Sequence, residues 1–460
     1  MSSVTLMDIL DARDRRAQRQ QQLLAAYGCP LLSFTMNIPG PVKNSPLIRR
    51  GFYLGMERLQ AALKGAGLST LSPEVLDEPT GCEFLCAIPG DPQTIKALCE
   101  AIEEGSPLGR LFDMDVLDET GQKLSRAVER GCLICGAPGR NCASRRLHSV
   151  EELQQATEQR LRDGLRAADG ARIGALVTQA LLDEVDTTPK PGLVDKNNNG
   201  SHRDMTRKTF YDSAAALAEY WPDCFQIGVE TASLSPEETF ARLRVRGLEA
   251  EKEMLRATGG VNTHKGAIFL LGILCGAIGR LWQPDKSLTA LEDVCGESRR
   301  MVSAALRAEW AELQENPPTR LTAGEQLYLQ YGIKGARGEA ESGFLRVLQT
   351  SLPVFEKELS RGKSRNEGSV AALLALIAQD ADTNMIHRGG LDRARQASRE
   401  AALRLRRDPE DYMHIAAELD ATFIAQNLSP GGCADLLSVT LFFHDLSLLF
   451  TERTVAPESR

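Results

Sequence analysis

The stretch SVEELQQATEQRLRDGLRAAD, residues 149–169, separates two parts of the chain that differ in their pattern of apolar and turn-forming residues. It opens with a Ser followed three residues later by a Glu, the pattern of a helix-capping box, and the residues after it keep helical spacing. Before it, short apolar runs alternate with Pro-Gly turns, as at residues 38–41 and 88–92. Such punctuation is typical of strands mixed with helices. We therefore expect an α+β domain at residues 1–165 and an all-α helical domain at residues 166–460.

The second part is rich in Ala and Leu at helical spacing, with short Gly, Asn and Pro loops between the periodic segments. Its longest uncharged run, residues 266–279, lies between Lys265 and Arg280 and is too short to cross a bilayer comfortably, so we expect a buried helix there. In the first part, the apolar residues 31–36 before a Pro-Gly-Pro turn predict a strand. Helices are predicted at residues 173–185, 209–219, 236–257, 266–282, 287–308, 369–379 and 391–406.

The composition is that of a globular protein without a strong charge bias. Of the 460 residues, 42% are apolar, and the formal net charge of −8 argues against bulk binding of nucleic acid. Eleven cysteines scattered over a chain of this length fit reduced thiols better than a secreted disulfide framework. The charged N-terminus holds no apolar run of the kind that a signal peptide needs. We expect a soluble, cytoplasmic protein that binds neither nucleic acid nor membrane.

A pair of carboxylates in the first part predicts a site for a hard cation. Residues 109–116 read GRLFDMDV, and in a strand the alternate side chains Asp113 and Asp115 lie on one face. Two carboxylates this close together suit Mg²⁺ bound to a triphosphate. The alternative is a solvated acidic turn that binds no metal.

Three cysteines and a histidine lie close together just before the dividing segment. Cys132, Cys135, Cys142 and His148 have a spacing compatible with a structural zinc site. The alternative is that Cys132 and Cys135 are reduced core residues, since thiols are common throughout the chain.

Residues 28–43, GCPLLSFTMNIPGPVK, resemble the hallmark of the citrate lyase holo-acyl-carrier-protein synthase family, CitX. The Asp-Met-Asp segment and the Cys/His segment look like that family too, so the resemblance covers residues 1–165. It implies a nucleotidyltransferase-like domain. The implied reaction transfers phosphoribosyl-dephospho-CoA to a serine of the apo acyl carrier (gamma) subunit of citrate lyase and releases pyrophosphate.

This reaction requires cations around the triphosphate, because the serine oxygen attacks its α-phosphorus. The resemblance makes Asp113 and Asp115 the catalytic, Mg²⁺-binding residues. The candidate contacts to the triphosphate are Lys43, Arg49 and Arg50, although simple solvation is the alternative for each. The malonate decarboxylase counterpart carries similar paired aspartates, so these alone do not select citrate lyase. A further alternative is a non-catalytic module that is stabilised by zinc and binds the acyl carrier subunit.

Four segments of the second part carry an unusual density of polar residues. The first, residues 186–204, contains prolines that exclude a helix, and its specific polar residues indicate a functional loop. The second, residues 258–266, is a Gly-rich turn before a helix, which suits phosphate binding without matching a P-loop. The third and fourth are residues 382–390 and 427–435. The alternative is that such residues only cap helices or place a charge in a first helical turn.

Together these segments resemble the triphosphoribosyl-dephospho-CoA synthase family, CitG, and residues 335–340 and 343–344 match a further segment of it. Cys433 departs from the family pattern, in which Ser is expected. The resemblance spans residues 165–460 and implies that ATP and 3′-dephospho-CoA give 2′-(5″-triphosphoribosyl)-3′-dephospho-CoA and adenine. A ribose hydroxyl would attack C1 of the ATP ribose through an oxocarbenium-like transition state. That reaction needs a carboxylate base, a proton donor for adenine, and Mg²⁺ on the triphosphate.

The carboxylate candidates for this reaction are Asp204, Asp382 and Asp435, whose acid and base roles the sequence leaves open. The candidate substrate-binding residues are Lys190, Asn262, His264, Lys265, Asn384, Arg388, Gly431 and Gly432. A rival interpretation is an ADP-ribose-type glycohydrolase, which is also helical with aspartate-rich loops. On the leading interpretation the chain is a bifunctional transferase, and the product of its second part is the substrate of its first.

Overall fold

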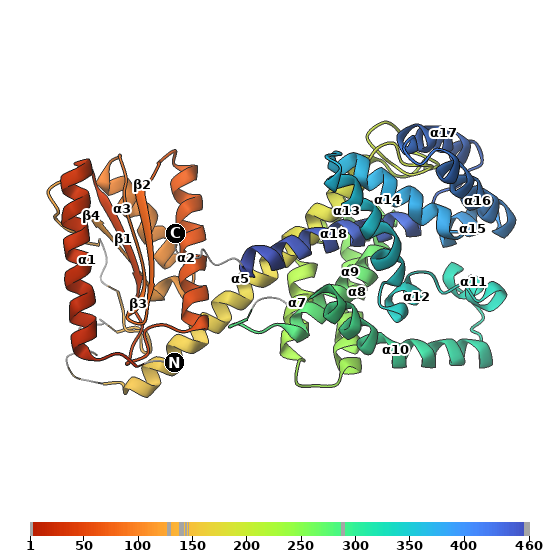
Figure 1. Cartoon of the computed structure of the whole chain (residues 1–460). Coiled ribbons are helices and arrows are strands. Elements are labelled where there is room, and N and C mark those ends of the chain that lie inside the picture. The colour runs from red at the N-terminus through yellow and green to blue at the C-terminus, as the bar shows by residue number, and fades with distance from the viewer. Residues whose placement is uncertain are drawn as a thin grey trace. The chain divides into compact units, whose positions relative to one another are not determined.

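The computed structural model describes residues 3–126, 130–137, 142, 145, 147–286 and 290–454. The chain forms two compact units (Figure 1), residues 1–168 with 284–286 and residues 169–283 with 287–460. The boundary between them falls within helix α5, Val150–Asp186.

Helix α5 begins with the capping box that the sequence predicts. The Ser149 hydroxyl accepts a hydrogen bond from the backbone N–H of Glu152 (3.1 Å), and the Glu152 carboxylate accepts one from the N–H of Ser149 (2.7 Å). These two bonds satisfy N–H groups that no carbonyl within the helix can reach, which fixes where the helix starts.

The first unit is a four-stranded antiparallel sheet of order β2–β3–β1–β4 with helices on both faces. The predicted strand at residues 31–36 is β1. The elements are α1 (Leu6–Tyr27), β1 (Leu31–Met36), α2 (Pro46–Gly65), β2 (Leu71–Glu78), β3 (Gly81–Ala87), α3 (Pro92–Glu104), the 3₁₀ turn η1 (Leu108–Leu111) and β4 (Phe112–Leu117).

One face of this sheet packs on α2 through aromatic rings. Phe34 of β1 stacks on Phe52 of α2 with ring centroids 4.7 Å apart, and it meets Phe112 of β4 edge-on at 5.4 Å. All three side chains are buried, so they anchor the core of the unit. Helix α1 contacts the sheet at β1 and β3. Because side chains alternate along a strand, the aspartates of β4 lie on the face opposite Phe112.

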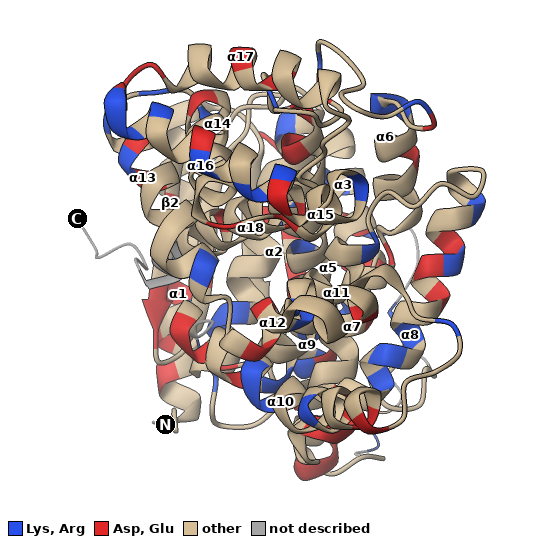
Figure 2. Cartoon of the chain, turned by 90° about the vertical axis from the view of Figure 1, so that its right-hand side faces the viewer, with Lys and Arg blue, Asp and Glu red and all other residues tan. Residues whose placement is uncertain are grey.

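The second unit is almost entirely helical over the residues described. Lys and Arg are interspersed with Asp and Glu along the helices (Figure 2). After α5, its elements are α6 (Arg207–Ala216), α7 (Tyr220–Glu230), α8 (Pro236–Ala257), α9 (Lys265–Leu281), α10 (Leu291–Glu315), α11 (Ala323–Tyr331), α12 (Gly335–Ser342), the π turn η2 (Val347–Ser351), α13 (Leu352–Ser360), α14 (Arg365–Gln379), α15 (Thr383–Gly389), α16 (Leu391–Arg407), α17 (Tyr412–Ala425) and α18 (Gly431–Thr454).

Helix α9 is the central helix of this unit and packs against α7, α8, α10 and α18. From Ala267 to Gly279 every residue except Phe269 is buried. A helix that is apolar on all sides must be enclosed by others, so the predicted buried helix at residues 266–279 is confirmed.

The other predicted helices are present, with some ends displaced. Helix α8 has the predicted bounds, whereas α6 ends at Ala216 and α10 extends to Glu315. Residues 287–289, where the prediction for α10 begins, lie outside the described residues. Helix α7 is absent from the prediction. It carries Pro222 in its first turn, where a missing N–H costs no helical hydrogen bond.

Within the described residues, one helix is long and apolar enough to cross a membrane by length and composition. It is the stretch Gly431–Leu449 of α18, and 61% of it is buried inside the protein. It packs against α9, α13 and α14. This degree of burial is that of a core helix of a soluble protein.

Candidate functional site

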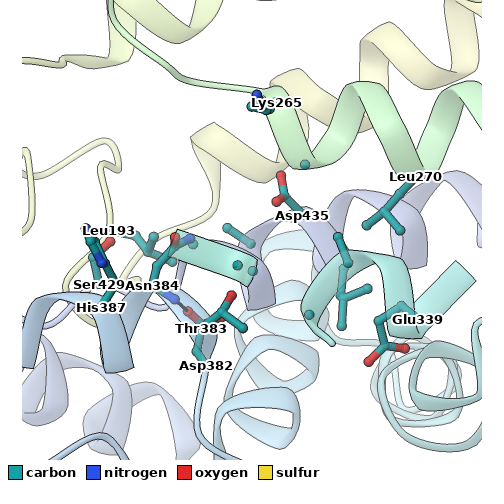
Figure 3. A pocket seen from close by; sticks show the side chains of 18 of the residues that line it. Leu193, Lys265, Leu270, Glu339, Asp382, Thr383, Asn384, His387, Ser429 and Asp435 are labelled. Atoms are coloured by element: carbon teal, nitrogen blue, oxygen red, sulfur yellow. Dashed lines mark hydrogen bonds between the residues drawn. The ribbon is translucent and has the colours of Figure 1, made fainter. Parts of the chain in front are cut away.

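A large cavity in the second unit gathers the four polar segments of the sequence. Its volume is about 1040 Å³, and its wall is formed by α5, α9, α12, α15 and α18, by the loop that follows α5, and by the loops that precede α9, α12, α15 and α18. Figure 3 shows Asp435 near the start of α9, between Asp382 on one side and Glu339 on the other. The predicted residues that line the cavity are Lys190, Asp204, Asn262, His264, Lys265, Asp382, Asn384, Arg388, Gly431, Gly432 and Asp435.

The loop of residues 186–204 is shaped by its own polar groups. The Asp195 carboxylate accepts a hydrogen bond from the Thr188 hydroxyl (2.7 Å) and three more from backbone N–H groups of the loop. Several of the polar residues that mark this segment therefore hold the loop together. Lys190 and Asp204 are the charged residues of the loop that face the cavity.

Lys190 forms a buried ion pair with Glu184, which the sequence analysis does not single out. The ammonium lies 2.6 Å from the Glu184 carboxylate and 2.8 Å from its backbone carbonyl, and the two side chains are 2% and 5% exposed. Glu184 lies in the last turn of α5, just before the polar loop, where it has the spacing of an ordinary helical residue. Only the fold shows that it faces the cavity.

The start of α9 holds a carboxyl group of the protein itself. The backbone N–H of Ala267 hydrogen-bonds the Asp435 carboxyl group. A Cβ atom added to Gly266 would lie 2.0 Å from Asp435 Oδ2, so only glycine allows this approach. Lys265, which begins the helix, pairs with Glu251 at 2.9 Å and is more than half exposed.

Asp382 fastens the starts of two helices to each other. One oxygen accepts from the N–H groups of Asn384 (2.7 Å) and Met385 (3.2 Å) in α15, and the other accepts from the N–H of Cys433 (2.8 Å) in α18. A Cβ atom on Gly432 would lie 2.7 Å from that second oxygen. Both oxygens are therefore engaged by backbone donors before any substrate arrives.

Three carboxyl groups share this poorly hydrated region, and burial raises the pKa of each. The pKa of Asp435 is well above its usual value because of burial, reinforced by the negative charges of Glu184 and Asp382. Burial also raises the pKa of Glu184, although the charge of Lys190 lowers it. Burial likewise raises the pKa of Asp382, although the backbone donors lower it. Asp435 is thus the carboxyl group of the cavity with the strongest tendency to keep its proton.

Another part of the cavity wall is basic. The Arg388 guanidinium donates to the carbonyl of Ser201 and to the carbonyl and side-chain oxygens of Asn427 (3.2 and 2.8 Å). None of the carboxylates among the described residues forms an ion pair with it, so its charge remains uncompensated. His202 lies in the same region, and its Nε2 is 2.8 Å from the Ser429 hydroxyl.

Asp204 is the most open of the predicted carboxylates. Its side chain is 66% exposed and lies 4.0 Å from Nδ1 of His202. Burial lowers the pKa of His202, and the neighbouring Arg388 lowers it further, so that ring is neutral near pH 7.

The sequence analysis also missed a charged pair formed by a residue of α12 and the residue just before η2. Glu339 lies 3.1 Å from the Arg346 guanidinium, and both line the cavity. Burial raises the pKa of Glu339. Glu339 lies in residues 335–340, which the sequence analysis names only as a segment that resembles the CitG family. His387, one residue before Arg388, lines the cavity too.

The first unit has a smaller cavity of about 170 Å³ on the α1 side of its sheet. Part of the CitX-like segment forms its wall together with α1, β3 and β4. Its polar lining residues are Arg13, Arg16, Thr35, Asn37, Lys43, Thr80, Glu83 and Asp113.

Asp113 and Asp115 lie on one face of β4, as the sequence predicts. Their partners on β1 are Thr35 and Ser33, respectively. Burial raises the pKa of Asp113, and the charge of Asp115 raises it further. Asp115 is not among the residues that line the cavity, and it pairs with Lys123 at 2.5 Å.

The predicted cations of this unit are not all in the cavity. Lys43 lines it and donates to the carbonyl of Ile38, and burial lowers the pKa of its ammonium. Arg49 pairs with Asp77 at 2.7 Å and does not line it. Glu83, which the sequence analysis does not single out, lies across β1 from Asp113, because both residues pair with Thr35.

The predicted zinc ligands come together in the structure. The ligand atoms of Cys132, Cys135, Cys142 and His148 all lie within 4.8 Å of one another. Cys135 Sγ is 3.4 Å from Cys142 Sγ, and the hydrogen bond with His148 lowers the pKa of Cys135 to about 6. This cluster has the composition of a structural metal site and could hold a metal ion.

The loop that carries the first two cysteines is anchored to the unit by two arginines. Arg110 donates to the carbonyl of Gly131 at 2.6 Å, and Arg160 of α5 donates to the carbonyl of Leu133 at 2.7 Å. All eleven cysteines of the chain are free thiols in the structure.

Comparison with known proteins gives two family matches that follow each other along the chain. Residues 4–164 match the apo-citrate lyase phosphoribosyl-dephospho-CoA transferase family, CitX. Residues 170–454 match the ATP:dephospho-CoA triphosphoribosyl transferase family, CitG.

Relatives of full length carry the same fusion. Protein CitXG of Haemophilus influenzae is 36% identical over 453 residues, which are 96% of each chain. Protein CitXG of Leuconostoc mesenteroides subsp. cremoris is 32% identical over 95% of this chain and 96% of its own. The 2-(5″-triphosphoribosyl)-3′-dephosphocoenzyme-A synthase of Haemophilus ducreyi is 39% identical and matches 69% of this chain over its whole length.

These matches confirm the fusion that the sequence predicts. The chain synthesises triphosphoribosyl-dephospho-CoA from ATP and dephospho-CoA, and it transfers phosphoribosyl-dephospho-CoA to apo-citrate lyase. It belongs to the CitXG family of bifunctional transferases, in which a CitX transferase precedes a CitG synthase.

Proposed function

We propose that the synthase reaction takes place in the large cavity of the second unit. On this proposal residues 166–460 form the synthase domain and residues 1–165 the nucleotidyltransferase-like domain. The observation that carries the proposal is the convergence of four polar segments, far apart in the sequence, on one cavity. A volume of about 1040 Å³ is large for a small-molecule site, as two nucleotide substrates require.

We assign proton donation to Asp435. As the glycosidic bond of ATP breaks, adenine keeps the electron pair on its ring nitrogen and takes the proton of the Asp435 carboxyl group. The 2′-oxygen of dephospho-CoA forms the new bond to C1 and loses its proton to an ionised carboxylate. Asp204, which is open to solvent, is the candidate for that base.

Asp382 has a positioning role in this scheme, because its oxygens are already held by backbone donors of α15 and α18. Arg388, with its uncompensated charge, is placed to bind a phosphate group of ATP or of dephospho-CoA. Mg²⁺ bound to the triphosphate would offset its remaining negative charge.

Incubation of the full chain with ATP, dephospho-CoA and Mg²⁺ tests the reaction. We expect free adenine together with a heavier coenzyme product in the mass spectrum. Ribose triphosphate without an adduct would contradict synthase activity and indicate a glycohydrolase.

A glycine substitution tests the placement of Asp435. We expect Gly266→Ala to lower the rate of adenine release roughly tenfold or more, because the new Cβ displaces the Asp435 carboxyl group. The overlap should cost about 1–3 kcal/mol of stability. The gain of about 1 kcal/mol in helix propensity offsets part of it, so we expect a folded variant with a modestly lower melting temperature. Gly296→Ala is the control: it is an exposed position of α10 with nothing within 4 Å of an added Cβ, so it gains helix propensity without touching the cavity. Equal adenine release in both variants would remove the assigned role of Gly266.

For the first unit, we propose that Asp113 and Asp115 bind Mg²⁺ and that Lys43 contacts the triphosphate. Carboxylate oxygens on one face of a strand suit Mg²⁺, so the donor set fits this ion. Bound there, Mg²⁺ would neutralise charge that develops on the phosphates. Glu83, across β1 from Asp113, is the other carboxylate that lines the small cavity. The serine of the acyl carrier subunit would displace pyrophosphate from the triphosphoribosyl group.

We further propose that the Cys/His cluster holds a structural zinc ion. Thiolates and imidazole are the preferred zinc ligands, and four of them close the coordination shell. The anchors at Gly131 and Leu133 then tie the metal loop to the sheet domain. This zinc is structural, and the reaction involves the carboxylates elsewhere in the unit.

Metal analysis and one substitution test this site. We expect about one zinc ion per chain of purified protein, and Cys135→Ser should lose it, because a tetrahedral site needs all four ligands. Carrier modification should fall in that variant, whereas adenine release should remain. Cys29→Ser is the control, since that thiol lies outside the cluster and should leave the zinc content unchanged. A wild-type chain without bound metal would contradict the zinc proposal.

The proposed partners are ATP, 3′-dephospho-CoA and the acyl carrier subunit of citrate lyase. Reduced cysteines throughout the chain support a cytoplasmic location, as does the use of ATP and a coenzyme A precursor.

A further inference from the structure

His264 has one ring nitrogen without a partner inside the protein. The residue is 3% exposed, lines the large cavity and immediately precedes α9. Its Nε2 is buried, and no described residue hydrogen-bonds it. Buried polar atoms are nearly always paired, so an orphaned one in a cavity wall points to a ligand.

The other ring nitrogen is held by a chain of hydroxyl groups. Thr263 donates its hydroxyl hydrogen to Ser213 Oγ at 2.8 Å, and Ser213 Oγ lies 2.7 Å from His264 Nδ1. Because Ser213 accepts from Thr263, its own hydrogen is free to be donated to Nδ1. An accepting Nδ1 in a neutral ring places the hydrogen on Nε2. If Nδ1 carried the hydrogen instead, Nδ1 and the Thr263 hydroxyl would both donate to Ser213. The buried Ser213 hydrogen could then bond to neither of them.

The ring stays neutral throughout the physiological range. Burial lowers the pKa of His264 to about 3, and the charge of Lys190 contributes in the same direction. The edge-to-face contact with Phe210, at 5.2 Å between centroids, helps to enclose it. A neutral imidazole N–H gives up its proton far too reluctantly to serve as an acid, but it is a good hydrogen-bond donor.

We infer that His264 is a fixed neutral donor that gives its Nε2–H to an oxygen of the ATP triphosphate. This inference rests on the proposed synthase site and adds a specific contact to it. Among the acceptors that the substrates offer, phosphate oxygens are anionic and form the strongest hydrogen bonds with N–H groups. The relay Thr263–Ser213–His264 fixes the orientation of the donor before ATP arrives.

The tautomer can be read directly by nitrogen NMR on the full chain labelled with ¹⁵N-histidine. The chain has six histidines, and His264→Gln identifies the signals of this one. We expect a protonated Nε2 and a bare Nδ1, unchanged between pH 6 and 8. A protonated Nδ1, or titration within that range, would overturn the inference. Ser213→Ala removes the hydroxyl, and we expect it to yield a mixture of tautomers.

Two amide substitutions test the contact, with inorganic tripolyphosphate as the probe at constant Mg²⁺. The nitrogen of Gln can occupy the Nε2 position and that of Asn the Nδ1 position. We expect His264→Asn to weaken tripolyphosphate binding and raise the KM for ATP by on the order of 10- to 100-fold, the effect of a lost bond to a charged group. His264→Gln should bind tripolyphosphate and ATP much more nearly like the wild type. Unchanged melting temperatures would show that both variants fold.

The outcomes separate this contact from the site that contains it. Equal tripolyphosphate binding by wild type, His264→Asn and His264→Gln would overturn the contact alone. Weakened binding of adenine with unchanged binding of tripolyphosphate would overturn the phosphate as its acceptor. Adenine release that is unaffected by Asp435→Asn would instead remove Asp435 as the acid of the proposed synthase site.

Discussion

Replacing Asp435 by Asn is expected to lower the rate of adenine release by on the order of 10²–10⁴, the usual contribution of a positioned general acid. Asn keeps the shape of the side chain and can still accept from the N–H of Ala267, but it has no proton to give to the leaving base. The measurement is adenine release by the full chain under saturating ATP and dephospho-CoA. Transfer to the carrier, supplied with ready-made triphosphoribosyl-dephospho-CoA, should be unchanged.

The same substitution should alter how stability depends on pH. Because the pKa of Asp435 is raised by folding above its usual value of 3.8, the folded state binds a proton more tightly than the unfolded state. The wild type therefore loses stability as the pH rises from about 4 through the folded pKa, whereas the Asn variant has no such group. We expect similar melting temperatures near pH 4 and a higher one for Asp435→Asn at pH 7.

Two further variants sharpen this test. Asp382→Asn turns one carboxylate oxygen into an N–H₂ group that faces a backbone donor, so it should lose about 1–3 kcal/mol of stability together with activity. Asp212→Asn removes an exposed partner of Lys208 and should change neither. If Asp435→Asn releases adenine at the wild-type rate, or if its stability follows pH as the wild type does, Asp435 is not the acid.

The polar segments of the second unit could be found from the sequence because they interrupt long apolar helices. Proline and glycine mark where helices stop, and a functional loop needs specific polar residues at such places. Residues inside helices give no such signal. Glu184 and Glu339 occupy ordinary helical positions, and only the tertiary fold directs them to the cavity. Conversely, Asp195 lies within the first polar segment, yet in the structure it holds the loop by four hydrogen bonds.

Helix ends were the least predictable part of the fold. The first turn of a helix tolerates proline and small polar residues, so α7 is hidden from a periodicity argument. The start of α9 was predicted from its Gly-rich turn, and phosphate binding there remains a prediction. What the sequence could not provide is that Asp435, far along the chain, lies at that helix end.

In the first unit, the alternation along β4 correctly places Asp113 and Asp115 on one face, because period two is fixed by strand geometry. The strand neighbour Glu83 could not be predicted, since its alignment with Asp113 depends on the order in which β3, β1 and β4 pair. Arg49 illustrates the reverse: it is a candidate for contact with the triphosphate, whereas in the structure it pairs with Asp77.

Asp113→Asn and Asp115→Asn are each expected to reduce carrier modification by about 10³-fold or more while adenine release continues at the wild-type rate. The amide has the same size but provides neither the charge nor the second oxygen that Mg²⁺ prefers. The measurement is the mass increase of the acyl carrier subunit, with triphosphoribosyl-dephospho-CoA supplied so that the synthase is not limiting. Asp14→Asn, an exposed change on α1, is the control for a lost carboxylate in the same unit.

The two aspartates need not respond alike, and the difference is informative. Asp113 lines the cavity, whereas Asp115 is paired with Lys123. If both bind the metal, that pair must open when the substrate arrives, and Lys123→Ala should leave transfer largely intact in the presence of excess Mg²⁺. If Asp115 only holds Lys123, then Asp115→Asn and Lys123→Ala should have the same modest effect, and Asp113 alone should be essential. Undiminished transfer by both Asn variants would leave the first unit with a carrier-docking role only, and the chemistry would then have to lie outside the Asp-Met-Asp strand.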